Sequence, residues 1–171
     1  MNPDQQTLLD WILAGLRIPE VREGRGDAAY LLGNMIAKYS LFADQYRLSE
    51  RASLEMERLG VDLSKTYKRG HFYGKKSPFI YEHPIPANAT LDHLLSLPPD
   101  ALNHSTLERV LEFTSPAYIL LREEDRSLAA ARLGNRMPEG WTWDGSPLAR
   151  YERVGIAMSK QFVHVEGKVK R

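Results

Sequence analysis

The segment from Lys65 to Pro86 reads KTYKRGHFYGKKSPFIYEHPIP and separates two parts of the chain that differ in composition. Its cations all come before its only acid, Glu82; they are Lys65, Lys68, Arg69, Lys75 and Lys76. Aromatic side chains alternate with these cations, namely Tyr67, Phe72, Tyr73, Phe79 and Tyr81. The segment therefore combines concentrated positive charge with aromatic rings, and Glu82 and His83 near its end are followed by prolines at positions 84 and 86.

Cations and aromatic rings together are typical of surfaces that bind nucleic acid. Cationic groups neutralise phosphates, and aromatic faces stack on unpaired bases. On this interpretation the candidate nucleic-acid-binding residues are Lys65, Lys68, Arg69, Tyr73, Lys75 and Lys76. The alternative interpretation is structural: the lysines belong to a solvated loop, and the aromatic side chains anchor that loop to the core.

The local structure predicted for this segment is irregular at first and then extended. Residues 65–76 contain Gly70 and Gly74 and show no helical period, which predicts a loop or an irregular hairpin. Residues 79–83 are rich in β-prone side chains and predict a short strand, and the prolines at 84 and 86 end it.

Upstream of this segment the chain is predicted to be helical. Apolar residues recur at helical spacing over residues 4–16, and a second pattern runs over residues 27–59 from an N-cap at Asp27 to a stop at Gly60. The second pattern is longer than an ordinary globular helix, so a break near Ser40 or Leu48 is also consistent with it.

Downstream, short helices alternate with a few strands. The patterns predict helices over residues 90–97, 100–113, 123–133 and 147–154, and strands over 117–121 and 161–165. The chain is therefore predicted to be a mostly helical α+β fold. It would form a single domain over residues 1–171, with one long amphipathic helix, a few short strands and a flexible basic tail at residues 167–171.

Composition limits the classes of protein that fit. The chain has 171 residues, 43% of them hydrophobic and 26% charged, as in ordinary globular domains. It has no cysteine, which excludes disulfides, zinc–cysteine sites and thiol nucleophiles. We expect a cytoplasmic protein without a membrane partner, because the N-terminus lacks a signal-peptide pattern and no apolar run approaches membrane-spanning length.

The end of the segment carries a second kind of chemistry, the sequence Glu82-His83-x-x-Pro86. This short pattern resembles the opening motif of HNH nucleases, the ββα-metal family. The resemblance implies that Glu82 ligates a divalent metal, Mg²⁺ or Mn²⁺, and that His83 is a general base that activates water against a phosphodiester. It also implies His104 as a second metal ligand. The structural alternative is that Glu82 and His83 stabilise a turn bounded by prolines.

Two further clusters have structural interpretations. Glu123, Glu124 and Asp125 follow a predicted buried strand, where acids favour the start of a helix. Trp141 and Trp143 lie in a predicted loop, and we expect them to cover an edge of the core.

Three hypotheses about function follow from these observations. The first is a nucleic-acid-processing protein that acts on DNA or RNA as a metal-dependent, HNH-like nuclease. The second is a protein that binds nucleic acid without catalysis, in which Glu82 and His83 are structural. The third is a protein-interaction protein, an inhibitor or regulator, that forms a homodimer or binds a protein partner through the long helix.

Overall fold

The computed structural model describes residues 3–23, 26–115 and 117–166, and they form a mixed α+β fold in one compact unit. The helices are α1 (Pro3–Leu16), α2 (Pro19–Arg22), α3 (Gly26–Leu41), α4 (Glu50–Arg58), α5 (Ala87–Ser96), α6 (His104–Thr114), α7 (Arg122–Ala130) and α8 (Ala149–Arg153), with a 3-10 helix over Pro99–Ala101. The strands are β1 (Gln45–Ser49), β2 (Thr66–Lys68), β3 (Phe79–Glu82), β4 (Tyr118–Leu121) and β5 (Met158–Glu166). The predicted fold class is confirmed, and the predicted tail at residues 167–171 lies outside the described residues.

The five strands form one mixed sheet in the order β2-β5-β1-β4-β3. The central strand β1 runs parallel to β4 and antiparallel to β5. The two edge strands pair differently, since β2 is parallel to β5 and β3 is antiparallel to β4. The segment 65–86 therefore supplies both edges of the sheet, with β2 on one side and β3 on the other.

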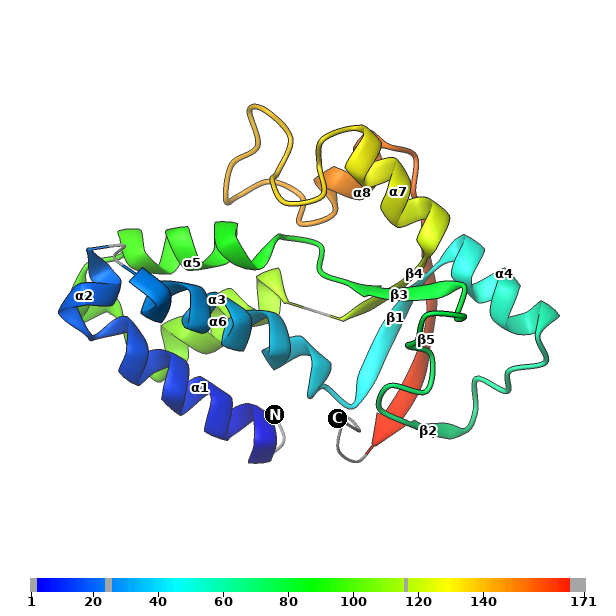
Figure 1. Ribbon diagram of the computed structural model, residues 1–171, viewed down its shortest axis with the longest axis horizontal. Coiled ribbons are helices and arrows are strands. Elements are labelled where there is room, and N and C mark those ends of the chain that lie inside the picture. The colour runs from blue at the N-terminus through cyan, green and yellow to red at the C-terminus, as the bar shows by residue number, and fades with distance from the viewer. Residues whose placement is uncertain (1–2, 24–25, 116, 167–171) are drawn as a thin grey trace.

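The hydrophobic side chains form three packed clusters, which lie between the elements drawn in Figure 1 as follows. The first lies among α1, α2, α3, α5 and α6, which form the helical half of the molecule. The second lies between one face of the sheet and α4, and it includes Phe72 and Phe79 from the segment 65–86. The third lies between the other face of β3 and β4 and the elements α7 and α8. The second and third clusters cover the two faces of the sheet unequally, because α7 and α8 reach only the β3–β4 side.

The helix predicted over residues 27–59 is not continuous. Helix α3 ends at Leu41, strand β1 follows, and α4 begins at Glu50, so the interruption starts next to Ser40 and includes Leu48, the two positions at which a break was expected. Tyr46 and Leu48 are buried while Arg47 is exposed, which is the alternation of a strand. Phe42 and Tyr46 also fit helical spacing, so the sequence could not separate the two periods. Ser49 then caps α4, because its hydroxyl accepts a hydrogen bond from the Ala52 amide.

The other predicted elements agree with the structure to different degrees. Helix α1 and the strands β3 and β4 lie where they were predicted. Strand β5 begins at Met158, earlier than expected, and the predicted loop over 65–76 contains the short strand β2. No helix in the described part of the chain is both long enough and apolar enough to cross a bilayer.

Candidate functional site

The Glu82-His83 turn lies where the sheet meets the helical half of the molecule. Glu82 is the last residue of β3, and the chain continues through Pro84, Ile85 and Pro86 directly into α5. A second strand does not follow β3 at this point, so the local order is strand and then helix, and the ββ hairpin that the HNH resemblance implies is not formed here. The turn instead connects the edge of the sheet to the first hydrophobic cluster.

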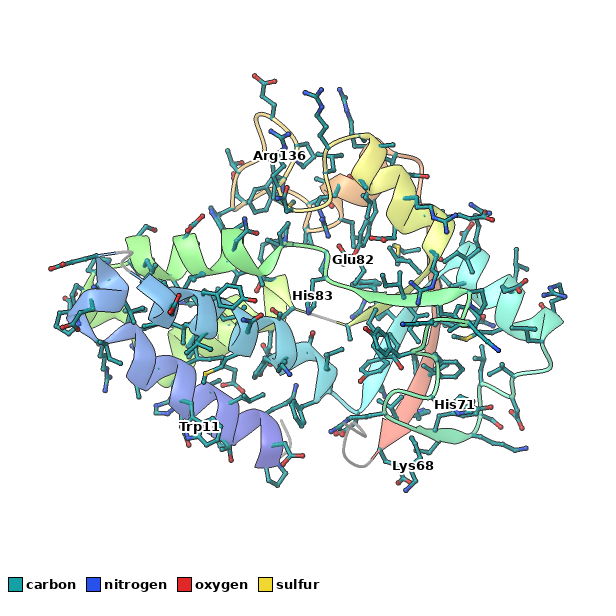
Figure 2. The ribbon with its side chains drawn as sticks, viewed as in Figure 1. Trp11, Lys68, His71, Glu82, His83 and Arg136 are labelled. Carbon is teal, nitrogen blue, oxygen red and sulfur yellow. The ribbon has the colours of Figure 1, made fainter. Side chains whose placement is uncertain are left out.

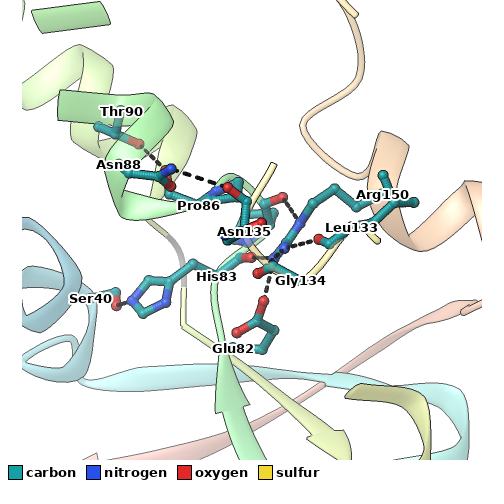
Figure 3. Close-up of polar contacts among 11 residues, drawn as sticks. Ser40, Glu82, His83, Pro86, Asn88, Thr90, Leu133, Gly134, Asn135 and Arg150 are labelled. Carbon is teal, nitrogen blue, oxygen red and sulfur yellow. Dashed lines mark hydrogen bonds and ion pairs between the residues drawn. The ribbon is translucent and has the colours of Figure 1, made fainter. Parts of the chain in front are cut away.

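A buried arginine holds this turn in place (Figure 3). Arg150 of α8 has no exposed surface. The Glu82 carboxylate accepts a hydrogen bond from its guanidinium, and so do the carbonyls of Pro84, Leu133, Gly134 and His83. The planar guanidinium offers five N–H donors. Through these hydrogen bonds, Arg150 connects helix α8 both to the end of β3 and to the loop that follows α7.

His83 points the other way, toward α3 (Figure 3). Its Nε2 lies 2.8 Å from the Ala37 carbonyl and 2.7 Å from the Ser40 hydroxyl. A carbonyl can only accept, so Nε2 carries the proton and Nδ1 carries the lone pair. Burial lowers the pKa of His83, the hydrogen bond to the Ala37 carbonyl opposes this effect, and the nearby charge of Arg150 lowers the pKa further, so the folded protein favours the neutral ring.

The metal ligands expected from the HNH resemblance are not brought together. Glu82 is paired with Arg150, and His104 at the start of α6 lies 2.8 Å from the Asp10 carboxylate on α1. Burial raises the pKa of Glu82. Arg150 opposes that effect, because its guanidinium is the cationic partner of the carboxylate. Within residues 3–23, 26–115 and 117–166, no group of three His, Asp or Glu side chains is placed to hold a metal ion. In this arrangement the Glu82 carboxylate is paired with a guanidinium, and His104 lies in a separate surface pair with Asp10.

The candidate nucleic-acid-binding residues fall into two groups. Arg69 is only 5% exposed, its guanidinium donates to the Asp44 carboxylate at 3.0 Å, and it lies over the Phe42 ring. Arg69 therefore acts as a structural contact between the segment 65–86 and the end of α3. The lysines Lys65, Lys68, Lys75 and Lys76 are exposed, as is Tyr73.

The exposed lysines have few counter-ions. Lys65 lies 3.5 Å from Asp62 in an exposed pair, which is a weak interaction in water. In the described part of the chain, no ion pair involves Lys68, Lys75 or Lys76. Their charge is therefore available to an anion in solution.

An arginine of α7 and aromatic side chains of the segment itself fix the conformation of this loop. Arg122 at the start of α7 donates to the Gly74 and Ser77 carbonyls, both at 2.8 Å. Tyr73 is 65% exposed and stacks on Tyr81 with ring centroids 5.8 Å apart. The anchoring role expected for the aromatic side chains is observed at Phe72, which is buried in the second cluster, whereas Tyr73 faces solvent.

The two kinds of chemistry in the segment 65–86 are thus separated in space. Figure 2 shows Lys68 and His71 beside β2, and Glu82 and His83 at the centre of the molecule between the helical half and α7. The residues are close in sequence, but the chain crosses from one edge of the sheet to the other between them.

The acids that follow β4 have the structural role that was expected. Glu124 is buried and accepts hydrogen bonds from the Ser49 hydroxyl at 2.6 Å and from the Leu121 amide at 2.8 Å. It therefore joins the N-termini of α4 and α7. Glu123 forms an exposed pair with Arg51 at 2.7 Å.

The two tryptophans border a hollow beside α5. Trp143 stacks on His93 with centroids 3.8 Å apart, and the Trp141 indole donates to the Ser146 carbonyl at 2.8 Å. These rings and the exposed Arg136 (Figure 2) line a cavity of about 480 Å³. The tryptophans are half-buried, in agreement with a role at an edge of the core.

The sequence did not point to Arg150, the residue with the most buried polar contacts at the turn. In the helix predicted over 147–154 it would be an ordinary surface cation, and its acceptors are mostly backbone carbonyls that carry no sequence signal. A comparison of the chain with protein-family models, with curated proteins and with solved structures finds no match.

Proposed function

We propose that this protein binds nucleic acid through the exposed cations of the segment 65–86. The observation that supports the proposal is that Lys68, Lys75 and Lys76 are exposed and have no ion pair with the described residues, beside an exposed aromatic ring at Tyr73. Unpaired surface lysines neutralise phosphates at little desolvation cost, since they stay in contact with water.

The rigidity of this loop also favours binding. Lysines on a loop that is held by Arg122 and by Ser77 lose less conformational freedom on binding than lysines on a free chain. The net charge of the whole chain is only +1, so the proposal depends on where the cations lie and not on their number.

Retention of labelled DNA and RNA, single- and double-stranded, tests the proposal. Replacing Lys68, Lys75 and Lys76 together by alanine should weaken binding on the order of 100-fold at moderate salt. The matched control removes three exposed cations from helices elsewhere, by alanine substitution of Lys38, Arg109 and Arg126. Equal weakening in both triple variants would show that only overall charge matters and would contradict a role for this segment.

A second candidate function is phosphodiester cleavage, for which the geometry of His83 is the specific support. Nε2 is fixed by the Ala37 carbonyl, the ring is held neutral, and Nδ1 makes no hydrogen bond with the described residues. A neutral imidazole with an unengaged ring nitrogen is the form that a general base requires.

Cleavage assays with Mg²⁺, with Mn²⁺ and with EDTA separate the two functions. A nuclease should lose cleavage in His83→Ala while it retains binding, and His104→Ala should show whether that residue contributes to metal dependence. Binding without cleavage under all three conditions would leave the nuclease hypothesis without support and the binding proposal intact.

If neither binding nor cleavage occurs, the exposed apolar side chains of α1 and α3 give the next hypothesis. Trp11, Tyr30 and Leu31 are each more than half exposed, as expected for a surface that contacts a protein partner or a second copy. Sedimentation at several concentrations would then show a dimer, and a monomer at all concentrations would count against self-association.

A further inference from the structure

Helices α7 and α8 cover one face of the sheet only at β3 and β4. The same face of β1, β5 and β2 is not covered by them. Tyr118 and Leu120 of β4 are buried under these helices. On the same face, the neighbours across β1, β5 and β2 are not covered: Gln45, Arg47, Phe162, Thr66 and Lys68 are all exposed. Lys160 is also exposed and lies next to them on β5, where the pairing with β1 is irregular. We define this set, together with His164, as the open face.

The pairing register places these side chains on a common surface. Arg47 is the partner of Tyr118 on one side and of Phe162 on the other. His164 is paired with Gln45 and with Thr66. Directly paired residues point to the same face of a sheet, and so do alternate residues of one strand, so Phe162 and His164 form a row along β5. Lys160 lies two residues before Phe162, where the pairing of β1 with β5 is irregular.

The chemistry of the open face is both cationic and aromatic. Phe162 is 41% exposed, whereas Val163 and Val165 of the same strand are buried in the second cluster on the opposite face. Its ring meets the His164 ring edge to face, with centroids 5.1 Å apart. Arg47 lies between Phe162 and Tyr118 in the register, and Glu166 opposite Lys68 is the acid at one end of the face.

We propose that the open face is a second binding surface, on which a single strand of nucleic acid lies across β5, stacks unpaired bases on Phe162 and His164, and places its phosphates near Arg47, Lys68 and Lys160. This inference rests on the proposed function and names its substrate class. An exposed ring flanked by cations fits the π-face of an unpaired base and the adjacent phosphate. The base faces of a duplex are covered by their neighbours, so a duplex cannot use the rings in this way.

Lys68 connects the two surfaces. It points toward the open face through its pairing with Glu166, while its neighbour Tyr67 packs in the second cluster on the opposite face. The rest of the segment 65–76 lies beyond this edge, with Phe72 in the second cluster on the opposite face, so a bound strand has to pass around β2 to reach it.

Fluorescence anisotropy with labelled oligo(dT), oligo(U) and a mixed-sequence duplex tests this inference on the full chain. Phe162→Ala should weaken binding of the single strands about 10-fold, and Phe162→Tyr should restore most of the affinity because the ring is retained. Leu54→Ala is the matched control, since Leu54 is 64% exposed on α4 and lies away from the open face.

The outcomes separate the inference from the proposed function. Single-strand binding that is unchanged in Phe162→Ala, or duplex binding as tight as single-strand binding, would overturn the open face as the site and leave binding by the lysine segment standing. No retention of any nucleic acid by the wild-type protein would overturn both. Photocrosslinking of an iodouracil-substituted oligonucleotide should label Phe162 or His164, and labelling confined to the helical half would contradict the inference.

Discussion

The Glu82-His83 turn and the open half of the sheet present opposite situations. At the turn, chemically versatile side chains are largely enclosed and hold partners: Glu82 is paired with Arg150, and Nε2 of His83 is engaged by Ala37 and Ser40. On the open face, ordinary side chains such as Phe162 and Arg47 are exposed. The comparison shows that a residue's chemical versatility does not indicate whether it is available to a ligand; its surroundings decide that.

The comparison predicts first that the turn depends on Arg150. Arg150→Met should lower the free energy of unfolding by about 3–5 kcal/mol, because it leaves the Glu82 carboxylate and several buried carbonyls without a donor. Arg150→Lys should recover only part of this loss, since an ammonium cannot reproduce the fork. Urea unfolding followed by circular dichroism measures both variants.

An unfolding free energy within about 0.5 kcal/mol of the wild type for Arg150→Met would show that the turn does not rely on this contact. Arg51→Ala is the matched control. It removes an exposed arginine that also pairs with a glutamate, and its effect should stay within about 0.5 kcal/mol.

A smaller loss is expected at the junction of α4 and α7. Glu124→Gln removes the charge from a buried carboxylate that accepts from Ser49 and from the Leu121 amide, and it should cost about 1–3 kcal/mol. Differential scanning calorimetry of this variant and of the exposed neighbour variant Glu123→Gln makes the comparison. Similar melting temperatures for the two variants would contradict the role assigned to Glu124.

The third prediction concerns pH and the state of His83. Its pKa is lowered in the folded protein, so the unfolded chain binds the proton more readily and stability should fall as the pH drops below about 6.5. For one proton the slope is at most about 1.4 kcal/mol per pH unit. His83→Gln keeps a donor for the Ala37 carbonyl without titrating in this range, so it should flatten the dependence.

Glu82 affects this measurement in the opposite direction. Burial raises its pKa, so its protonation at low pH favours the folded state. The difference between the wild type and His83→Gln at each pH cancels this contribution. An identical pH dependence in the two proteins would show that His83 is not held neutral by its surroundings.

The smallest effect is expected at His104. The side chain is exposed and pairs with Asp10 on the surface, so His104→Ala should change the free energy of unfolding by less than about 0.5 kcal/mol. Chemical denaturation at pH 7 provides the measurement. A loss of several kcal/mol would mean that the contact between α1 and α6 depends on this pair.

Different parts of the molecule were predictable from sequence for different reasons. Helix α1 and the strand β4 follow from periodic or continuous apolar runs with clear limits, and the acids after β4 follow from the preference of helix N-termini. Strand β1 was not found, because Tyr46 and Leu48 also continue the helical spacing of α3.

The arrangement of side chains around the candidate sites could not be read from sequence. Arg69 and Lys68 are adjacent cations, yet one is buried against Asp44 and the other is exposed. The alternation over residues 161–165 predicted a strand, but it could not show which face of that strand would be left uncovered. That depends on the distant elements α7 and α8.

The most direct test of the account is the salt dependence of single-strand binding by the wild-type protein and by the triple alanine variant at Lys68, Lys75 and Lys76. We expect the logarithm of the wild-type association constant to fall linearly with the logarithm of the salt concentration. The triple variant should have a slope that is shallower by about 2, from about 0.7 per lost phosphate contact. Parallel lines for the two proteins, or an affinity that does not change with salt, would contradict the claim that these exposed cations bind nucleic acid.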